Sequence, residues 1–180
     1  RKYKPNFKPS EDCVILKIGG KKVASTQAFC TVGGLPKAGK SSFLNAMIAS
    51  AFVPYDIFSM KLTFPENRNR LCLFDTESSD FDYYNRIEGI RKFTDYPHMP
   101  HNFDSYQVRE DGTHSIRKMV ERYLELNPDC SVLVLDGLLD LIMNYNDESE
   151  STLLTKWLKK ITKVLLQIHL LLMIYFKWIR

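Results

Sequence analysis

The feature that most constrains this chain is a glycine-rich segment, GLPKAGKS, at residues Gly34 to Ser41. It matches the pattern G-x-x-x-x-G-K-[ST] at every fixed position and follows a strand-like run, Gln27 to Val32. Helical spacing of apolar side chains begins directly after it, in the segment Ser41 to Phe52. A glycine-rich loop between a strand and a helix start predicts a phosphate-binding loop on an α/β fold.

The residues of this loop are suited to hold a phosphate group and its metal ion. Backbone N–H groups at a helix start have no intrahelical partner and attract an anion. Gly39 lets the main chain approach the phosphate, Lys40 is expected to reach its outer oxygens, and the Ser41 hydroxyl is expected to complete a Mg²⁺ shell. A surface turn that contains glycines is the alternative. The predicted nucleotide-binding residues are Gly34, Lys37, Ala38, Gly39, Lys40, Ser41 and Ser42.

An apolar run that ends in an acid follows later in the chain. The segment Ser131 to Leu135 (SVLVL) is typical of a strand covered on both faces, and Asp136 comes directly after it. Open α/β sheets bind their ligands at the carboxyl ends of the strands. Asp136 is therefore predicted to bind Mg²⁺ together with Ser41, and a turn-forming aspartate is the alternative.

A second apolar run, Arg70 to Phe74, also ends in acids. A carboxylate at this position would orient and polarise the water that attacks a terminal phosphate. On residue chemistry alone, Asp75 and Glu77 are equal candidates for this role. The alternative is that these acids belong to a helix cap together with residues 78–80.

The rest of the chain alternates strand-like and helical segments. Further strands are expected at Val14 to Ile18 and Lys21 to Val23, joined as a hairpin by Gly19 and Gly20, and at Phe103 to Val108 and His169 to Phe176. Further helices are expected at Ser115 to Leu126, at Glu148 to Lys163, and around an apolar face formed by Phe81, Tyr84, Ile87 and Phe93. This alternation predicts a mainly parallel sheet with helices on both faces and a small N-terminal β-hairpin.

Basic residues are expected on the outer surfaces of two of these helices. Their spacing is ordinary for a solvated helix face, and contact with a neighbouring molecule or with DNA phosphates is the alternative. The residues are Arg86, Arg91 and Lys92 on one helix and Lys156, Lys159, Lys160 and Lys163 on the other.

Composition indicates one globular domain in the cytoplasm. The 180 residues are 44% hydrophobic and 26% charged with a net charge of +4, which excludes a disordered or fibrous chain. The four cysteines form no C-x-x-C pair, which favours a reduced, intracellular protein. The basic start carries no signal-peptide core, and the run Val164 to Phe176 is shorter than the roughly 20 apolar residues that span a bilayer. No membrane partner is expected.

Three segments together resemble one family. The set GLPKAGKSS, LFDTE and VLVLDG, with the preceding ILKIGGKKV, resembles the RecA-like P-loop ATPases, in particular the ring helicases and the ATPases of plasmid and mobilisable-element replication and mobilisation. The resemblance covers residues 12 to 170. It implies a tail at residues 1–11 and a RecA-like domain at residues 12–180 that ends early relative to the family.

The resemblance also implies the ligands and the roles of individual residues. ATP and Mg²⁺ would be bound, with Lys40 and Ser41 on phosphate and metal and Asp136 as the Walker B acid. Glu77 would be the catalytic carboxylate, with Lys40 as the second catalytic residue. The implied activity is Mg²⁺-dependent ATP hydrolysis coupled to remodelling of single-stranded or duplex DNA in replication, mobilisation or helicase action by a homo-oligomeric ring.

Two alternative functions remain open on the sequence. One is a regulatory nucleotide-binding domain that does not hydrolyse ATP, and the other is a P-loop kinase of a small molecule. In the family, the strand after Walker B ends in a Gln or His that senses the terminal phosphate. Here only Lys177 or Arg180 is available to replace it, which favours the regulatory alternative.

Overall fold

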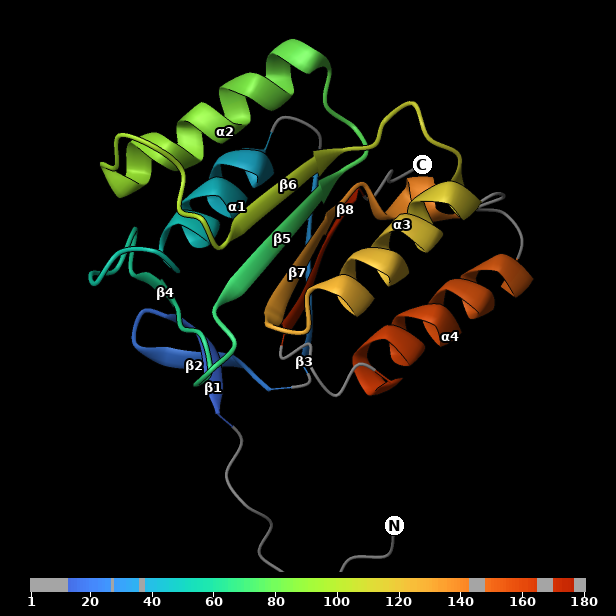
Figure 1. The fold of residues 1–180 in the computed structure, drawn as a ribbon, viewed down its shortest axis with the longest axis horizontal. Helices are drawn as coiled ribbons and strands as arrows, with labels where there is room; N and C mark the ends of the chain where they lie inside the picture. Colours follow the sequence, from blue (N-terminus) through green and yellow to red (C-terminus); the bar gives the residue numbers. More distant parts are fainter. Residues whose placement is uncertain (1–12, 27, 36–37, 143–147, 165–169, 177–180) are drawn as a thin grey trace, which may run out of the picture.

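The computed structural model describes residues 13–26, 28–35, 38–142, 148–164 and 170–176 (Figure 1). The strands are β1 (Val14–Ile18), β2 (Lys21–Ser25), β3 (Ala28–Gly34), β4 (Met60–Leu62), β5 (Arg70–Asp75), β6 (Phe103–Gln107), β7 (Cys130–Asp136) and β8 (Leu170–Phe176). The helices are α1 (Lys40–Ala49), α2 (Asp80–Thr94), α3 (Thr113–Leu126), α4 (Glu148–Val164) and a short 3-10 turn, η1 (Leu138–Leu141). The expected helices and strands are all present, most with ends shifted by a few residues.

A five-stranded sheet in the order β3-β8-β7-β5-β6 forms the centre of the fold. Its neighbouring strands are all parallel, so their carboxyl ends meet at one edge. The register of β5 and β7 brings Asp75 directly beside Asp136, although the two residues are far apart in sequence. The loop after β3, the acids after β5 and Asp136 therefore lie at the same edge.

Helices cover both faces of this sheet, as predicted. In Figure 1, α1 and α2 lie on one face and α3 and α4 on the other. Alternate residues of β5 divide accordingly, because successive side chains of a strand point to opposite faces. Leu71 and Leu73 pack in the core cluster of α1, whereas Cys72 and Phe74 pack in the cluster of α3 and α4.

The predicted N-terminal hairpin is confirmed and is part of a larger unit. β1 and β2 pair antiparallel around Gly19 and Gly20, whose φ angles of 57° and 72° suit glycine. The short strand β4 adds to the free side of β1, giving a three-stranded sheet in the order β2-β1-β4. The sequence did not indicate β4, because its three residues are too few to show a period.

The predicted apolar face of α2 is wrong in its first half. Phe81 and Tyr84 are exposed, at 73% and 63%, whereas Arg86 is only 5% exposed. The buried residues of α2 are Arg86, Ile90 and Thr94, which recur every four residues, and Ile87 and Phe93 of the predicted face are partly buried against the same core. The prediction failed because the first buried residue of this face, Arg86, lies over the acidic ends of β5 and β7 and is therefore polar. Arg86 is therefore buried, and the expectation that it lies on the outer surface of the helix is wrong.

The face of α4 is as predicted where its side chains are described. Leu154, Trp157, Leu158 and Ile161 are buried, and Lys156, Lys159 and Lys160 are exposed. The Lys160 ammonium lies 3.0 Å from a carboxylate oxygen of Glu121 on α3. The side chains of Lys163, Lys177 and Arg180 lie outside the described residues. Within the described ranges, none of the helices combines the length and apolar character needed to cross a membrane.

Candidate functional site

The glycine-rich loop joins β3 to α1, as the motif predicts. Gly39 is the N-cap of α1 and has a φ of 77°, a left-handed conformation that favours glycine. No side chain caps this helix start among the residues described, and its first turn carries no acid. The first N–H groups of α1 are therefore left for an external acceptor. Lys37 lies outside the described residues, and Ala38 is exposed.

Lys40 folds back over the loop that precedes it. Its Nζ donates hydrogen bonds to the carbonyl oxygens of Leu35 at 2.6 Å and of Gly34 at 3.2 Å. A Cβ at Gly34 would lie 3.6 Å from the Lys40 side chain, so the backbone and the lysine stem pack closely. The ammonium group is thus held at the loop, close to the uncapped start of α1.

A cavity of about 440 Å³ opens beside the start of α1. This volume lies in the ordinary range of small-molecule sites. Its wall combines hydroxyl, amide, carboxylate and guanidinium groups from three segments of the chain. The lining residues are Ser41, Ser42 and Asn45 of α1, Glu77 and Ser78 after β5, and Asp82, Asn85 and Arg86 of α2. The structure therefore brings Ser41, Ser42 and Glu77, all predicted site residues, to one cavity.

The two acids after β5 differ in their surroundings. The Asp75 carboxylate is completely buried and accepts the backbone N–H groups of Glu77 at 3.1 Å and of Ser78 at 2.9 Å. It also accepts a hydrogen bond from the Ser78 hydroxyl at 2.7 Å. Burial alone would raise the pKa of Asp75, but the Arg86 charge and the Ser78 hydrogen bonds lower it below its ordinary value. Asp75 thus stabilises the turn after β5.

Glu77, by contrast, lines the cavity and is exposed. Partial desolvation, together with the negative charges of Asp136, Asp140 and Asp75, raises the pKa of Glu77 to about 7. A carboxyl group with a pKa near 7 accepts a proton readily at neutral pH. The geometry therefore favours Glu77 over Asp75 as a general base.

Asp136 at the end of β7 is 4% exposed and forms an ion pair with Arg86. Nη1 of the same guanidinium donates to Asp75 Oδ2 at 2.6 Å, and Nε donates to the Asn45 side-chain oxygen at 3.2 Å. Nη2 is buried and, within the described part of the chain, has no hydrogen-bond partner. Burial, and then the Asp75 charge, raise the pKa of Asp136, and Arg86 opposes that rise. The sequence missed this role of Arg86, since nothing in its own helix signals burial.

The turn after β7 holds the carboxyl ends of β5 and β7 together. Gly137 has a φ of 95°, and a Cβ there would lie 1.9 Å from Thr76 Oγ1. That hydroxyl lies 2.9 Å from the carbonyl oxygen of Asp136 and 2.5 Å from a carboxylate oxygen of Asp140. Only glycine fits at Gly137, and the close approach fixes the loop that carries Glu77 against the end of β7.

The donor chemistry around the cavity suits Mg²⁺. Magnesium prefers hard oxygen ligands and retains several waters. The Ser41 hydroxyl lines the cavity, whereas Asp136 and Lys40 are not among its lining residues, and the Asp136 carboxylate pairs with the lining residue Arg86. In the part of the chain that is described, no group of three or more His, Cys, Asp or Glu side chains is placed to hold a metal ion. The residues fit a metal that takes the rest of its shell from phosphate and water. The Asp136 carboxylate already carries a cation, the Arg86 guanidinium.

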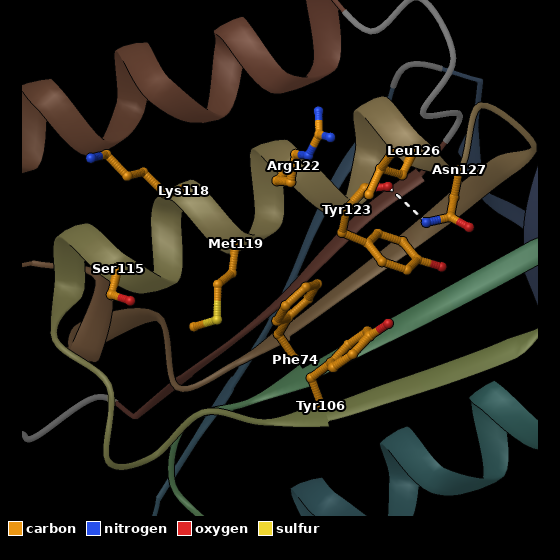
Figure 2. A pocket seen from close by; sticks show the side chains of 9 residues that line it. All are labelled: Phe74, Tyr106, Ser115, Lys118, Met119, Arg122, Tyr123, Leu126 and Asn127. Carbon is orange, nitrogen blue, oxygen red and sulfur yellow. Dashed lines mark hydrogen bonds between the residues drawn. The ribbon is translucent and has the colours of Figure 1, made fainter.

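A second hollow, of about 430 Å³, lies beside α3 on the opposite face of the sheet (Figure 2). The rings of Phe74, Tyr106 and Tyr123 gather there, with centroids of Phe74 and Tyr106 5.2 Å apart. The ends of the Lys118 and Arg122 side chains point away from these rings in Figure 2. None of the predicted site residues lines this hollow, so it is separate from the candidate site.

Comparison with known proteins adds no family assignment. No protein-family model matches the chain, and a search among curated proteins gives no significant match. Function is therefore inferred from the residues and the geometry described above.

Proposed function

We propose that this chain is a RecA-like P-loop ATPase domain that binds Mg·ATP in the cavity beside α1 and hydrolyses its terminal phosphate. One observation carries the proposal. The uncapped start of α1, with Ser41 and Ser42, and the carboxylate of Glu77 line the same cavity. The first group is suited to hold phosphate, and the second is suited to activate the water that attacks it.

The residues have distinct tasks in this proposal. The N–H groups at the start of α1 bind the phosphate chain, and Lys40 exchanges its loop carbonyls for phosphate oxygens. Ser41 and Asp136 would supply oxygen ligands to a metal ion, whose charge would offset that of the phosphate oxygens. Glu77 orients the attacking water and takes its proton at the carboxylate. The raised pKa of Glu77 suits that transfer at neutral pH.

Coupling of hydrolysis to DNA remodelling is the part of the proposal that depends on the family resemblance. The three motifs resemble those of ring helicases and of plasmid and mobilisable-element ATPases, whose sites act within oligomers. We therefore propose single-stranded or duplex DNA as the polymer and a homo-oligomeric ring as the working form.

A second candidate is a nucleotide-binding regulator without turnover. The observation that favours it is the Arg86 ion pair, which occupies the carboxylate that a catalytic metal ion needs. In such a protein, the bound nucleotide would act as a conformational ligand. The presence of Glu77 in the same cavity favours hydrolysis instead.

Turnover and binding measured on the same samples distinguish the two candidates. ATP hydrolysis is measured with and without single-stranded DNA, and nucleotide binding by calorimetry, for wild type and Glu77→Gln. An ATPase motor gives DNA-stimulated turnover that is lost in Glu77→Gln while binding persists. Binding without turnover in the wild type indicates the regulator, and no binding at all contradicts both. Glu125→Gln, on the exposed side of α3, is the matched control.

A further inference from the structure

Two buried carboxylates lie side by side at the edge of the sheet. Asp75 and Asp136 are register partners on β5 and β7, and they are 0% and 4% exposed. Two neighbouring anions in a buried place strongly disfavour each other unless a cation lies between them. The arrangement is therefore stable only with a positive charge at this position.

Arg86 supplies that charge. Its guanidinium pairs with Asp75 and Asp136 together, and both pairs involve Nη1. Asn45 on α1 accepts a hydrogen bond from Nε and so holds the guanidinium from the second helix. The side chain thus spans from α2 to the strand ends and has α1 as its support.

The same guanidinium is incompletely satisfied. Nη2 is buried and has no hydrogen-bond partner among the residues that the structure describes, which is unusual for a native polar group and costs free energy. Arg86 is 5% exposed and also lines the cavity, so it lies next to the space in which a ligand would bind. The position that Arg86 holds is therefore one that it can leave once another cation supplies the charge.

We propose that Arg86 is a positioning residue that stands in for the metal ion at Asp136 while the site is empty and releases Asp136 when the metal ion binds. The guanidinium pairs with Asp136 Oδ2 and would repel a metal ion bound to the same carboxylate, so the binding of one weakens the binding of the other. Asp75, which no part of the proposed mechanism uses as a metal ligand, keeps Arg86 after the release. The inference depends on the proposed function only in that Asp136 is the metal ligand.

The proposal predicts an effect of Mg²⁺ on stability that can be measured without nucleotide. In wild type, Arg86 already offsets one of the two negative charges and pairs with both carboxylates, so Mg²⁺ alone is expected to bind there more weakly than in its absence. Arg86→Gln removes the cation and leaves two buried anions unpaired. Mg²⁺ alone is then expected to bind between them and recover part of the lost stability.

The test is thermal unfolding in 10 mM MgCl₂ against KCl of equal ionic strength, without nucleotide. Arg86→Gln is expected to unfold at a lower temperature than wild type and to gain about 4 °C from Mg²⁺. Wild type and the control Arg91→Gln, on the same helix, are expected to gain less than about 1 °C. An equal Mg²⁺ response in Arg86→Gln and wild type overturns the proposal, since a merely structural arginine gives that result.

A milder variant keeps the test decisive if Arg86→Gln does not fold. Asn45→Ala leaves the arginine in place and removes only the acceptor of its Nε. We expect a gain from Mg²⁺ in the same direction but of about half the size. Asn45→Ala that responds like wild type then counts against the proposal.

Failure of the proposed function gives a different result. If ATP does not bind to wild type and Mg²⁺ still stabilises Arg86→Gln selectively, the ATPase proposal fails and the role of Arg86 stands. If ATP binds with Mg²⁺ and the variant shows no selective response, the ATPase proposal stands and the role of Arg86 is refuted.

Discussion

The starts of α1 and α2 lie at the same edge of one parallel sheet and line one cavity. They differ in whether a side chain of the chain itself accepts hydrogen bonds from their first backbone N–H groups. α1 begins at Gly39, which offers no side-chain acceptor. α2 begins at Ser79, whose hydroxyl accepts the N–H of Asp82 at 3.2 Å, and Asp80 and Asp82 add negative charge in the first turn. An anion suits the N-terminus of a helix. At α2, side chains of the chain itself provide the negative groups. At α1, no side chain of the described residues does so, which leaves the position for a bound anion.

Lys40→Ala should have the largest effect on the α1 side of this comparison. The variant removes a cation from the loop and so removes charge-assisted hydrogen bonds to phosphate. We expect the affinity for Mg·ATP to fall at least about 100-fold, measured by calorimetry. Lys92→Ala, an exposed lysine of α2, is the control and should bind as wild type does. Unchanged affinity in Lys40→Ala would remove the loop from the site.

Gly39→Ala tests whether the shape of the loop matters apart from its charge. A left-handed φ costs a residue with a Cβ roughly 1–2 kcal/mol, although no atom of the described residues lies within 4 Å of the added group. We expect the free energy of unfolding to fall by about 1 kcal/mol and the affinity for ATP by about tenfold. Denaturant titration and calorimetry measure the two effects.

Gly112→Ala is the matched control for that variant. Gly112 is the N-cap of α3 and has an ordinary φ of −75°, again with open space around the added Cβ. The free energy of unfolding of Gly112→Ala should stay within about 0.5 kcal/mol of wild type. Alanine is a poorer N-cap than glycine, but it also restricts the unfolded chain, and the two effects offset each other. Equal losses of unfolding free energy in Gly39→Ala and Gly112→Ala would show that the left-handed conformation of Gly39 does not matter for stability.

The pH dependence of stability tests Glu77 in the empty site. The pKa of Glu77 is raised from 4.5 to about 7 in the folded chain, so its ionisation opposes folding. Its contribution to stability is complete below pH 4.5 and is lost as the pH rises toward 7. Glu77→Gln should therefore match wild type at pH 4 and exceed it by about 1 kcal/mol at pH 8, allowing for solvent screening at an exposed group.

Urea titrations of both proteins at the two pH values measure this difference. Glu125→Gln serves as the control, since that glutamate lies on the exposed side of α3. A Glu77→Gln stability difference that does not change with pH would mean that the neighbouring carboxylates do not act on Glu77.

Ser79→Ala should have the smallest effect on nucleotide and so define the α2 side of the comparison. Loss of the cap is expected to cost about 1 kcal/mol of stability in denaturant titration. Affinity for ATP should change less than about twofold, since this helix start is already satisfied by its own side chains. Ser79→Asp retains a capping oxygen and should keep the stability. A large loss of nucleotide affinity in Ser79→Ala would break the contrast.

The order of strands and helices was predictable because it depends on short-range periodicity. β5 and β7 are continuous apolar runs, and each is followed by acids that the sheet collects at one edge. β4 was missed because its pairing with β1 is a long-range contact of a three-residue segment. Local pattern also failed on α2, where the chain exposes Phe81 and Tyr84.

The candidate site was predictable in its loop and only partly in its acids. The glycine-rich motif predicted its own place between a strand and a helix start, because that pattern lies within one segment. Asp75 and Glu77 were equal candidates on residue chemistry alone, the family resemblance favoured Glu77, and the structure shows Asp75 closing the turn after β5. Burial of Arg86 depends on two carboxylates from strands that pair only in the folded sheet, and no pattern within α2 indicates that pairing.

Hydrogen exchange of backbone amides tests the central claim most directly, because it reports on both helix starts in one experiment. The chain is compared with and without Mg·ATP, or with a slowly hydrolysed analogue. The N–H groups of residues 38–43 at the start of α1 should become protected, while those of residues 79–83 at the start of α2 stay as they are. Protection confined to the α2 start, or no change at either, would contradict a nucleotide site at the glycine-rich loop.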